Sequence, residues 1–163
     1  MKTNARDWHL ADAATTERVG GALARALSGG MVVTLAGDLG AGKTTLVRGA
    51  LRELGWTGAV KSPTYTLVEC YAVSSLYFYH FDFYRFADPG EWETAGLADY
   101  FRRDSVCIVE WPERVADLLP LPDLAIELTH AGDGRDLRAV SHSPDGDRCL
   151  DAMSLLGLRA PVA

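Results

Sequence analysis

Hydrophobic positions recur at helical spacing in two early segments of the chain, which are separated by a short run that is mostly apolar. Residues 16–28 carry an apolar stripe, which predicts an amphipathic helix that Thr15 or Thr16 can cap. Residues 31–36 are apolar or β-branched, as in a buried strand. A second helical stripe over residues 43–54 predicts a helix shortly after this strand. The first third of the chain therefore reads as helix, strand, loop and helix.

The pattern then changes to extended segments. Residues 60–69 contain Pro63, which disfavours helical backbone at the residue before it, so we expect an extended segment here. Residues 76–81 are rich in aromatic side chains and predict a strand. Because the connection between the two segments is short, they are expected to pair as an antiparallel hairpin. Such a hairpin is unusual within a parallel sheet.

The second half of the chain again alternates helical and apolar segments. We expect a helix at 91–101, a strand at 106–109, a short helix at 113–119, strands at 123–130 and 135–141 joined by a glycine-rich turn, and a last helix at 147–156. The short apolar run at 106–109 is typical of a parallel strand covered on both faces. The last two strands are expected to form a β-rich appendage.

The loop between the first strand and the second helix carries the strongest chemical signal. The sequence here is Gly37-Asp38-Leu39-Gly40-Ala41-Gly42-Lys43-Thr44-Thr45, which contains the pattern G-x-x-x-x-G-K-T. The glycines allow backbone N–H groups to point inward at phosphate oxygens, and the following helix adds its positive N-terminal end. Lys43 can reach the β- and γ-phosphates of a nucleotide, and the Thr44 hydroxyl can ligate Mg²⁺. The pattern and its context predict a nucleotide-phosphate site.

A site of this kind also needs a carboxylate at the end of a neighbouring strand, which holds Mg²⁺ directly or through water. Asp82 follows the second strand of the predicted hairpin, and Glu110 follows the apolar run at 106–109. Each position is also consistent with a polar residue that merely closes its strand. The sequence leaves open which of the two carboxylates contacts the metal.

Hydroxyl, imidazole and indole groups near these carboxylates offer further chemistry. Thr64 and Thr66 lie on the proline-stiffened segment, where a hydroxyl in switch-type NTPases senses the γ-phosphate and its metal. Their spacing is equally consistent with solvent-facing residues of a strand. His80 is a candidate base, although a hydrogen-bonded structural histidine is the commoner case. Trp111 is expected in the core rather than in a binding surface.

Composition and charge narrow the class of protein. The chain has 163 residues, 48% hydrophobic and 23% charged, which suits one globular domain over residues 1–163 with a sizeable core. Its net charge of −6 argues against strong binding of RNA or DNA by the chain alone. The three cysteines form no C-x-x-C pair, and neither a signal-peptide segment nor an apolar run long enough to cross a bilayer is recognisable. These features favour a cytoplasmic protein without membrane contact.

Two absences bear on the identity of the nucleotide. The only asparagine is Asn4, and the N/T-K-x-D motif that reads guanine is missing. The chain contains no glutamine, so activation of water would fall to a carboxylate or a hydroxyl. We therefore expect ATP rather than GTP.

Several motifs occur in an order that resembles one known family. Beside the phosphate loop, these are Val60 to Glu69, His80-Phe81-Asp82 with Tyr84-Arg85, Gly96 with Asp99-Tyr100-Phe101, and Glu110-Trp111-Pro112. With these motifs the chain resembles the bacterial TsaE (YjeE) family, the small P-loop ATPase of tRNA threonylcarbamoyladenosine biosynthesis. The resemblance runs from about Thr15 to about Pro122 and fades beyond it.

The resemblance implies a fold and an activity. The fold would be a three-layer α/β P-loop NTPase sandwich with a mostly parallel central sheet and an antiparallel hairpin. The chain would bind ATP and Mg²⁺ and would hydrolyse ATP slowly alone. It would act with the TsaB and TsaD proteins, which transfer threonylcarbamoyl to the adenosine next to the anticodon of ANN-decoding tRNAs, so its contact with tRNA would be indirect. Self-association stays open.

Residue roles follow from the same resemblance. The residues implied are Thr15 beside the adenine, Leu39 to Thr44 around the phosphates, Ser62 to Thr66 as a switch-like segment, Asp82 as a carboxylate that orients water, and Thr44 with Glu110 as metal ligands. Catalysis would thus fall to Lys43, Asp82 and Glu110. Phe83 stands where the family usually has leucine, a departure that concerns packing more than chemistry.

Two other functions are compatible with the phosphate loop. A small-molecule kinase usually carries an arginine-rich lid, and no lid is recognisable in this sequence. A nucleotide-gated binding module would need nucleotide binding without turnover. The favoured prediction is an ATPase whose slow turnover is completed by partner proteins, because no arginine lies in a fixed motif that would complete the phosphate site. Arg85 is a candidate within the chain, and salt bridging is its simpler role.

Overall fold

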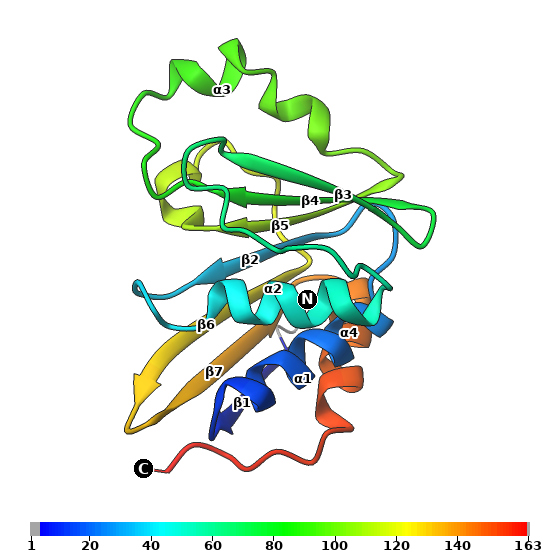
Figure 1. The fold of residues 1–163 in the computed structure, drawn as a ribbon, viewed down its shortest axis with the longest axis vertical. Helices are drawn as coiled ribbons and strands as arrows, with labels where there is room; N and C mark the ends of the chain where they lie inside the picture. The colour runs from blue at the N-terminus through cyan, green and yellow to red at the C-terminus, as the bar shows by residue number, and fades with distance from the viewer. Residues whose placement is uncertain (1–3, 163) are drawn as a thin grey trace.

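A seven-stranded mixed sheet forms the centre of the molecule (Figure 1). In this computed structural model, which describes residues 4–162, the strands are β1 (Asn4–Leu10), β2 (Val32–Ala36), β3 (Val68–Val73), β4 (Leu76–Asp82), β5 (Ser105–Glu110), β6 (Leu124–Ala131) and β7 (Gly134–Ser141). Their order across the sheet is β1-β7-β6-β2-β5-β4-β3. The central pairs β4–β5, β5–β2 and β2–β6 are parallel, and the outer pairs are antiparallel. The predicted single domain spans residues 1–163, of which residues 1–3 and 163 lie outside the described residues.

Helices cover both faces of this sheet. The helices α1 (Ala13–Arg25), α2 (Lys43–Glu53) and α4 (Pro144–Ser154) pack on one face over a mainly aliphatic core. On the other face lie α3 (Gly90–Thr94) and the 3-10 helices η1 (Leu97–Tyr100) and η2 (Pro112–Val115), over a core rich in aromatic side chains. The predicted three-layer α/β class is therefore confirmed. The antiparallel hairpin is found as β3–β4, but its first strand is Val68–Val73 rather than the predicted segment 60–69. Residues 64–66 form a turn, and Leu67 at φ +65° separates this turn from the strand. No helix within residues 4–162 is long and apolar enough to cross a membrane.

The helices α1 and α2 lie side by side (Figure 1) and approach so closely that glycine is required where they touch. A Cβ atom added to Gly20 would lie 2.1 Å from the carbonyl oxygen of Leu46. One added to Gly49 would lie 2.1 Å from a backbone carbonyl of α1. The neighbouring Gly21 differs, because its added Cβ would make an ordinary contact of 3.7 Å with Glu53. The position of α2, and of the loop that precedes it, is thus fixed by backbone contact with α1.

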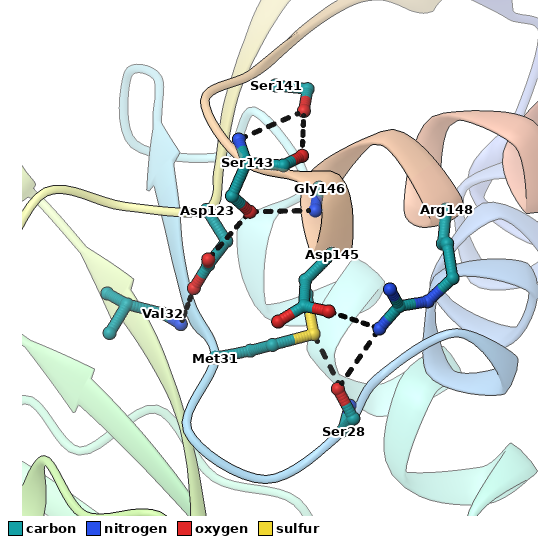
Figure 2. Close-up of polar contacts among 9 residues, drawn as sticks. All are labelled: Ser28, Met31, Val32, Asp123, Ser141, Ser143, Asp145, Gly146 and Arg148. Atoms are coloured by element: carbon teal, nitrogen blue, oxygen red, sulfur yellow. Dashed lines mark hydrogen bonds and ion pairs between the residues drawn. The ribbon is translucent and has the colours of Figure 1, made fainter.

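Asp123, directly before β6, joins three elements through hydrogen bonds (Figure 2). Its carboxylate accepts a hydrogen bond from the N–H of Val32, the first residue of β2, at 2.9 Å, and one from the hydroxyl of Ser143 at 2.7 Å. Ser143 is the N-cap of α4, and its side-chain oxygen accepts a hydrogen bond from Gly146 N–H at 3.1 Å. The last helix is thereby tied to the start of the central strand.

The C-terminal strands occupy a different place from the one predicted. They form a hairpin as expected, but they are not an appendage, because β6 pairs in parallel with β2 and β7 pairs with β1. The strand β1 is not predicted at all, since only Trp8 and Leu10 among its seven residues are buried. The hairpin thus connects the first strand to the centre of the sheet.

Helix boundaries differ from the prediction where a stronger local signal competes. α1 begins at Ala13 and is capped by Asp12, whose carboxylate accepts the N–H of Thr15 at 2.8 Å, so neither predicted threonine is the cap. A left-handed residue, Gly96 at φ +64°, interrupts the predicted helix 91–101 and separates α3 from η1. The remaining differences are that the predicted helix 113–119 is replaced by the short η2, Pro112–Val115, that α1 ends at Arg25, and that α4 spans Pro144–Ser154.

Candidate functional site

The loop between β2 and α2 is built from glycines in conformations that other residues rarely adopt. Gly37, Gly40 and Gly42 have φ values of +146°, +78° and +105°. Gly42 is the N-cap of α2 and offers no side-chain hydrogen bond to the first turn of the helix. The N–H groups of that turn are therefore left for an external acceptor, and the helix dipole favours an anion at the same place.

Lys43 lies at the centre of this loop. Only 5% of its surface is exposed, and its Nζ donates hydrogen bonds to the carbonyl oxygens of Gly37 and, at 3.1 Å, Asp38. The ammonium also lies 4.3 Å from the ring centroid of Trp111, a cation–π distance. Burial lowers the pKa of Lys43, and the negative charge of Glu110 acts in the opposite direction. Its hydrogen-bond acceptors are uncharged, so an anionic oxygen would compete well for this group.

The strand ends place Glu110 beside Thr44. In the parallel pair β4–β5, Asp82 and Glu110 are partners in register, so both carboxylates lie at the carboxyl ends of their strands. The Thr44 hydroxyl donates to Oε2 of Glu110 at 3.4 Å. Glu110 is 3% exposed, and no hydrogen bond to its other oxygen, Oε1, is found within residues 4–162.

His80 supports Glu110 from inside the sheet. Its ring is fully buried, with Nε2 2.5 Å from Oε2 of Glu110, and its Nδ1 has no partner among the described residues. We assign the ring proton to Nε2, where the carboxylate of Glu110 accepts its hydrogen bond. A proton on Nδ1 would instead leave a buried N–H without an acceptor, which costs more free energy than a lone pair without a donor. The imidazole does not line the cavity described below, so the geometry matches the structural role weighed for His80 rather than that of a base.

Asp82 holds the predicted switch-like segment. Its Oδ2 accepts a hydrogen bond from the Ser62 hydroxyl at 2.8 Å, and its Oδ1 accepts the N–H of Tyr84 at 2.9 Å. The Thr64 hydroxyl lies 3.4 Å from that of Ser62. Thr66 instead donates to a carboxylate oxygen of Glu69, at 3.4 Å. The structure thus brings Ser62 and Thr64 to the candidate site and leaves Thr66 outside it.

Most of the predicted residues line one cavity of about 410 Å³, within the usual range for small-molecule sites. Its lining consists of residues 39–45 of the loop and helix start, together with Ser62, Thr64, Asp82, Tyr84, Arg85, Glu110 and Trp111. Of the predicted residues, Thr15, Asp38 and Thr66 do not line it. A larger cavity of about 700 Å³ lies between η2 and the strands β2, β6 and β7, and contains none of the predicted residues.

Thr15 lies at the first turn of α1, on the other side of the loop. Its hydroxyl donates to the carboxylate of Asp12 at 2.7 Å, and it lines neither the main cavity nor its neighbour. That neighbour is a smaller cavity of about 220 Å³, and its lining includes Thr16, the loop glycines 40 and 42, and residues 133–135, among them Arg135. The role predicted for Thr15 is untested by this geometry.

Trp111 and Arg135 were not predicted to act at the site, and Arg85 was only weighed as a candidate. Trp111, expected in the core, lines the main cavity with a left-handed backbone at φ +56°, a strained state for a non-glycine residue. Arg85, for which salt bridging was the simpler role, forms no ion pair within residues 4–162, and its guanidinium stacks 4.8 Å from the exposed ring of Tyr65. Arg135 of β7 donates hydrogen bonds to the loop carbonyls. The adjacency of Trp111 to Glu110 is the one signal that the sequence offered.

The donor set fits Mg²⁺ better than a transition metal. Thr44 and Glu110 present hydroxyl and carboxylate oxygens, the hard ligands that Mg²⁺ prefers. No group of three or more His, Cys, Asp or Glu side chains that could hold a metal ion occurs within residues 4–162. Mg²⁺ usually binds with only one or two protein groups beside water and substrate phosphates, so this pair suffices for a metal that arrives with a nucleotide.

Comparisons with known proteins agree on one family. A family model described as threonylcarbamoyl adenosine biosynthesis protein TsaE matches residues 10–138. The chain is 46% identical over 124 residues to the tRNA threonylcarbamoyladenosine biosynthesis protein TsaE of Haemophilus influenzae, covering 76% of this chain and 78% of that one. It is 39% identical over 141 residues to the Bacillus subtilis protein of the same name, covering 86% and 87%. The crystal structure of Bacillus subtilis YdiB is similar over 96% of this chain and 99% of its own, with a TM-score of 0.81 and 30% identity.

Proposed function

The chain belongs to the TsaE family of threonylcarbamoyl adenosine biosynthesis proteins, and on this premise we propose that it is a Mg²⁺-dependent ATPase that acts in the formation of threonylcarbamoyladenosine in tRNA. The observation that carries the proposal is the meeting of Lys43, Thr44 and Glu110 at the uncapped N-terminus of α2. A phosphate loop, a hydroxyl and a strand-end carboxylate at one place are the parts that phosphoryl transfer from a nucleotide needs.

The phosphates of ATP are bound by the loop amides, the first turn of α2 and Lys43. The Lys43 ammonium exchanges the carbonyl oxygens of Gly37 and Asp38 for phosphate oxygens and stabilises negative charge on the group being transferred. Thr44 and Glu110 would hold Mg²⁺, which would supply further neutralisation of the phosphate oxygens. His80 fixes the orientation of the Glu110 carboxylate.

Asp82 lines the same cavity, together with Ser62 and Thr64 of the switch-like segment. Because Asp82 accepts the hydrogen bond of Ser62, it holds this part of the segment in the cavity, where we propose that the γ-phosphate lies. A change in that phosphate can therefore be sensed through Ser62 and Thr64, and Asp82 is the carboxylate nearest to this segment for orienting water. The adenine is proposed to lie beside the start of α1, where Thr15 lies.

Hydrolysis by the isolated chain is expected to be slow. Arg85 lines the cavity, but its guanidinium is stacked on Tyr65, a residue that is 84% exposed. The partners proposed to complete the site are the TsaB and TsaD proteins, which handle the tRNA, in keeping with the net charge of −6 of this chain. We place this activity in the cytoplasm, where the unpaired thiols of Cys70, Cys107 and Cys149 stay reduced.

The test is ATP hydrolysis by the purified chain, alone and with the TsaB–TsaD pair. We expect stimulation by the pair and a loss of roughly 10²–10³-fold in Lys43→Ala, since one preorganised charge at the transferring phosphoryl group is removed. The matched control is Arg103→Ala, which removes an exposed cation near the amino end of β5, away from the cavity. Glu110→Gln, which keeps the shape of the side chain, should shift the Mg²⁺ dependence of hydrolysis to higher concentration.

Two results would contradict the proposal. Hydrolysis that is equal in the wild type and Lys43→Ala would mean that the activity does not arise at this loop. Appearance of a phosphorylated small molecule in step with ATP consumption would identify a kinase instead.

Thermal unfolding with and without ATP separates binding from turnover, because a ligand of the folded state raises its stability by mass action.

A further inference from the structure

Arg135, the second residue of β7, directs its guanidinium at the phosphate loop. Its Nε donates to the carbonyl oxygen of Ala41 at 3.2 Å, and its Nη2 donates to that of Gly40 at 3.0 Å. Its Nη1 donates to the carbonyl oxygen of Gly134 in its own strand at 2.7 Å. The two loop acceptors lie 94 and 95 residues earlier in the chain. One side chain therefore joins the β6–β7 turn to the loop, on the side of the molecule where both lie in Figure 1.

The positive charge of Arg135 is committed to these backbone carbonyls. Within residues 4–162 no carboxylate forms an ion pair with it, although Asp133 and Asp136 are near in sequence. Asp136 instead contacts Nδ1 of His9, at 2.8 Å. Hydrogen bonds from a charged donor are stronger than neutral ones, and the guanidinium fork can hold two successive carbonyls at once.

Holding those carbonyls also orients the amides that follow them. In a trans peptide the C=O and the next N–H point in opposite directions, and no cis peptide bond occurs in the described part of the chain. With the carbonyls of Gly40 and Ala41 turned toward Arg135, the N–H groups of Ala41 and Gly42 are turned away from it. The Ala41 N–H donates to Asp38 at 3.0 Å, and no hydrogen bond of Gly42 N–H is found within residues 4–162. The Gly42 amide is thus left for a phosphate oxygen.

The loop needs such support because its own residues provide little. Half of residues 37–42 are glycines at positive φ, which lose more conformational freedom on ordering than other residues do. The hairpin also meets the start of the loop, where a Cβ on Gly37 would lie only 2.5 Å from the carbonyl oxygen of Leu128 in β6. The hairpin therefore contacts the loop at both of its ends.

We propose that Arg135 is a positioning residue that holds the loop in its phosphate-binding conformation from the side opposite the phosphates, which makes the β6–β7 hairpin part of the nucleotide site. The inference rests on the proposed function for the identity of the ligand. Loss of the two loop hydrogen bonds should raise the Kd for ATP about tenfold, equivalent to about 1.4 kcal/mol, because binding must then also order the loop.

The experiment compares Arg135→Ala and Arg135→Lys with Arg138→Ala. Arg138 is the matched control, since it lies on the opposite face of the same strand and pairs with Asp7 at 2.8 Å, away from the loop. Three quantities are measured: the Kd for ATP with Mg²⁺ by calorimetry, the midpoint of urea unfolding, and hydrogen exchange of the ligand-free protein in a peptide covering residues 38–46. Both Arg135 variants should show the raised Kd and faster exchange in this peptide, whereas Arg138→Ala should show neither. Lysine should not rescue, because an ammonium lacks the planar fork.

The alternative of a merely structural arginine gives a different result. Equal losses of ATP affinity in Arg135→Ala and Arg138→Ala, or unchanged exchange of the loop peptide in Arg135→Ala, would overturn the proposal. If Arg135→Ala does not fold, Arg135→Lys gives the same readings. If the wild type does not bind ATP, the proposed function fails, while loop exchange in the ligand-free variants still decides whether Arg135 holds the loop.

Discussion

The contact between α1 and α2 allows two neighbouring glycines to be assigned opposite effects on stability. Both Gly20 and Gly21 lie within α1 and are buried. Helix propensity alone predicts that replacing either by alanine stabilises the protein by about 0.8–1.0 kcal/mol. The packing separates them, because a Cβ at position 20 would lie 2.1 Å from the carbonyl oxygen of Leu46 and 2.9 Å from the amide nitrogen of Ala50. At position 21 the new atom would find ordinary contacts, at 3.7 Å.

The size of the effect follows from these distances. The atoms that a Cβ at position 20 would meet belong to the backbone of α2, so no side chain can turn aside and the helices must separate. Overpacking of this kind costs about 1–3 kcal/mol or more, and most of this range exceeds the roughly 0.8–1.0 kcal/mol gained in helix propensity. We therefore expect Gly20→Ala to be less stable than the wild type by about 1–2 kcal/mol, and Gly21→Ala to be more stable by about 1 kcal/mol. For a chain of this size these changes correspond to about 2–4 °C in Tm per kcal/mol.

The assay is urea unfolding of the wild type and the two variants, followed by circular dichroism and by tryptophan fluorescence. Comparable slopes in the three proteins would allow the midpoints to be read as stability. A midpoint for Gly20→Ala at or above that of the wild type, with the slope unchanged, would refute the reasoning. It would mean that α2 can move away from α1 without loss of stability. A midpoint for Gly21→Ala that falls as far as that of Gly20→Ala would show that the contact distances do not determine the outcome.

Two further predictions use the pKa shifts. Burial raises the pKa of Cys107 and Cys149 to about 12, and it also raises the pKa of Cys70, which is nevertheless exposed. At about pH 8 Ellman's reagent should therefore react first with Cys70 in the folded protein and with all three thiols in urea. Equally rapid reaction of all three thiols in the folded protein would contradict this. Hydrogen bonds from Thr15 lower the pKa of Asp12 below its ordinary value of 3.8. The stabilising effect of the ionised Asp12 is therefore present above pH 3.8 and is lost as the pH falls through the lower pKa of the folded protein. Asparagine can still cap α1, so the urea midpoint of Asp12→Asn should fall less between about pH 5 and about pH 3 than that of the wild type.

The phosphate loop is predictable from sequence because its chemistry is local. The glycines, Lys43 and Thr44 act within a few residues of one another, and the strand and helix around them have clear hydrophobic periods. Asp82 and Glu110 are also recognisable, because strand ends at the same edge of a parallel sheet converge. The residues that support them are harder to find. Nothing near His80 in sequence indicates that its ring faces Glu110.

The place of the terminal strands depends on pairing, which is not a local property. The strand β1 has few apolar positions of its own and becomes a strand through its partner β7. The hairpin β6–β7 is recognisable as a hairpin, but its parallel pairing with β2 depends on contacts such as Asp123 with Val32, 91 residues apart. For the same reason the contacts of Arg135 with the loop have no signature in the sequence around it.

The pairing of the first strand with the last has a consequence for synthesis on the ribosome. β1 ends at Leu10, whereas its partner β7 begins at Gly134. At about 5–20 residues per second, roughly 6–25 s pass between the emergence of the two strands. During that interval β2 also lacks its partner β6, and the loop after it lacks Arg135. We therefore expect the nascent chain to carry the whole proposed phosphate-binding motif but to complete the candidate site only when β7 is made.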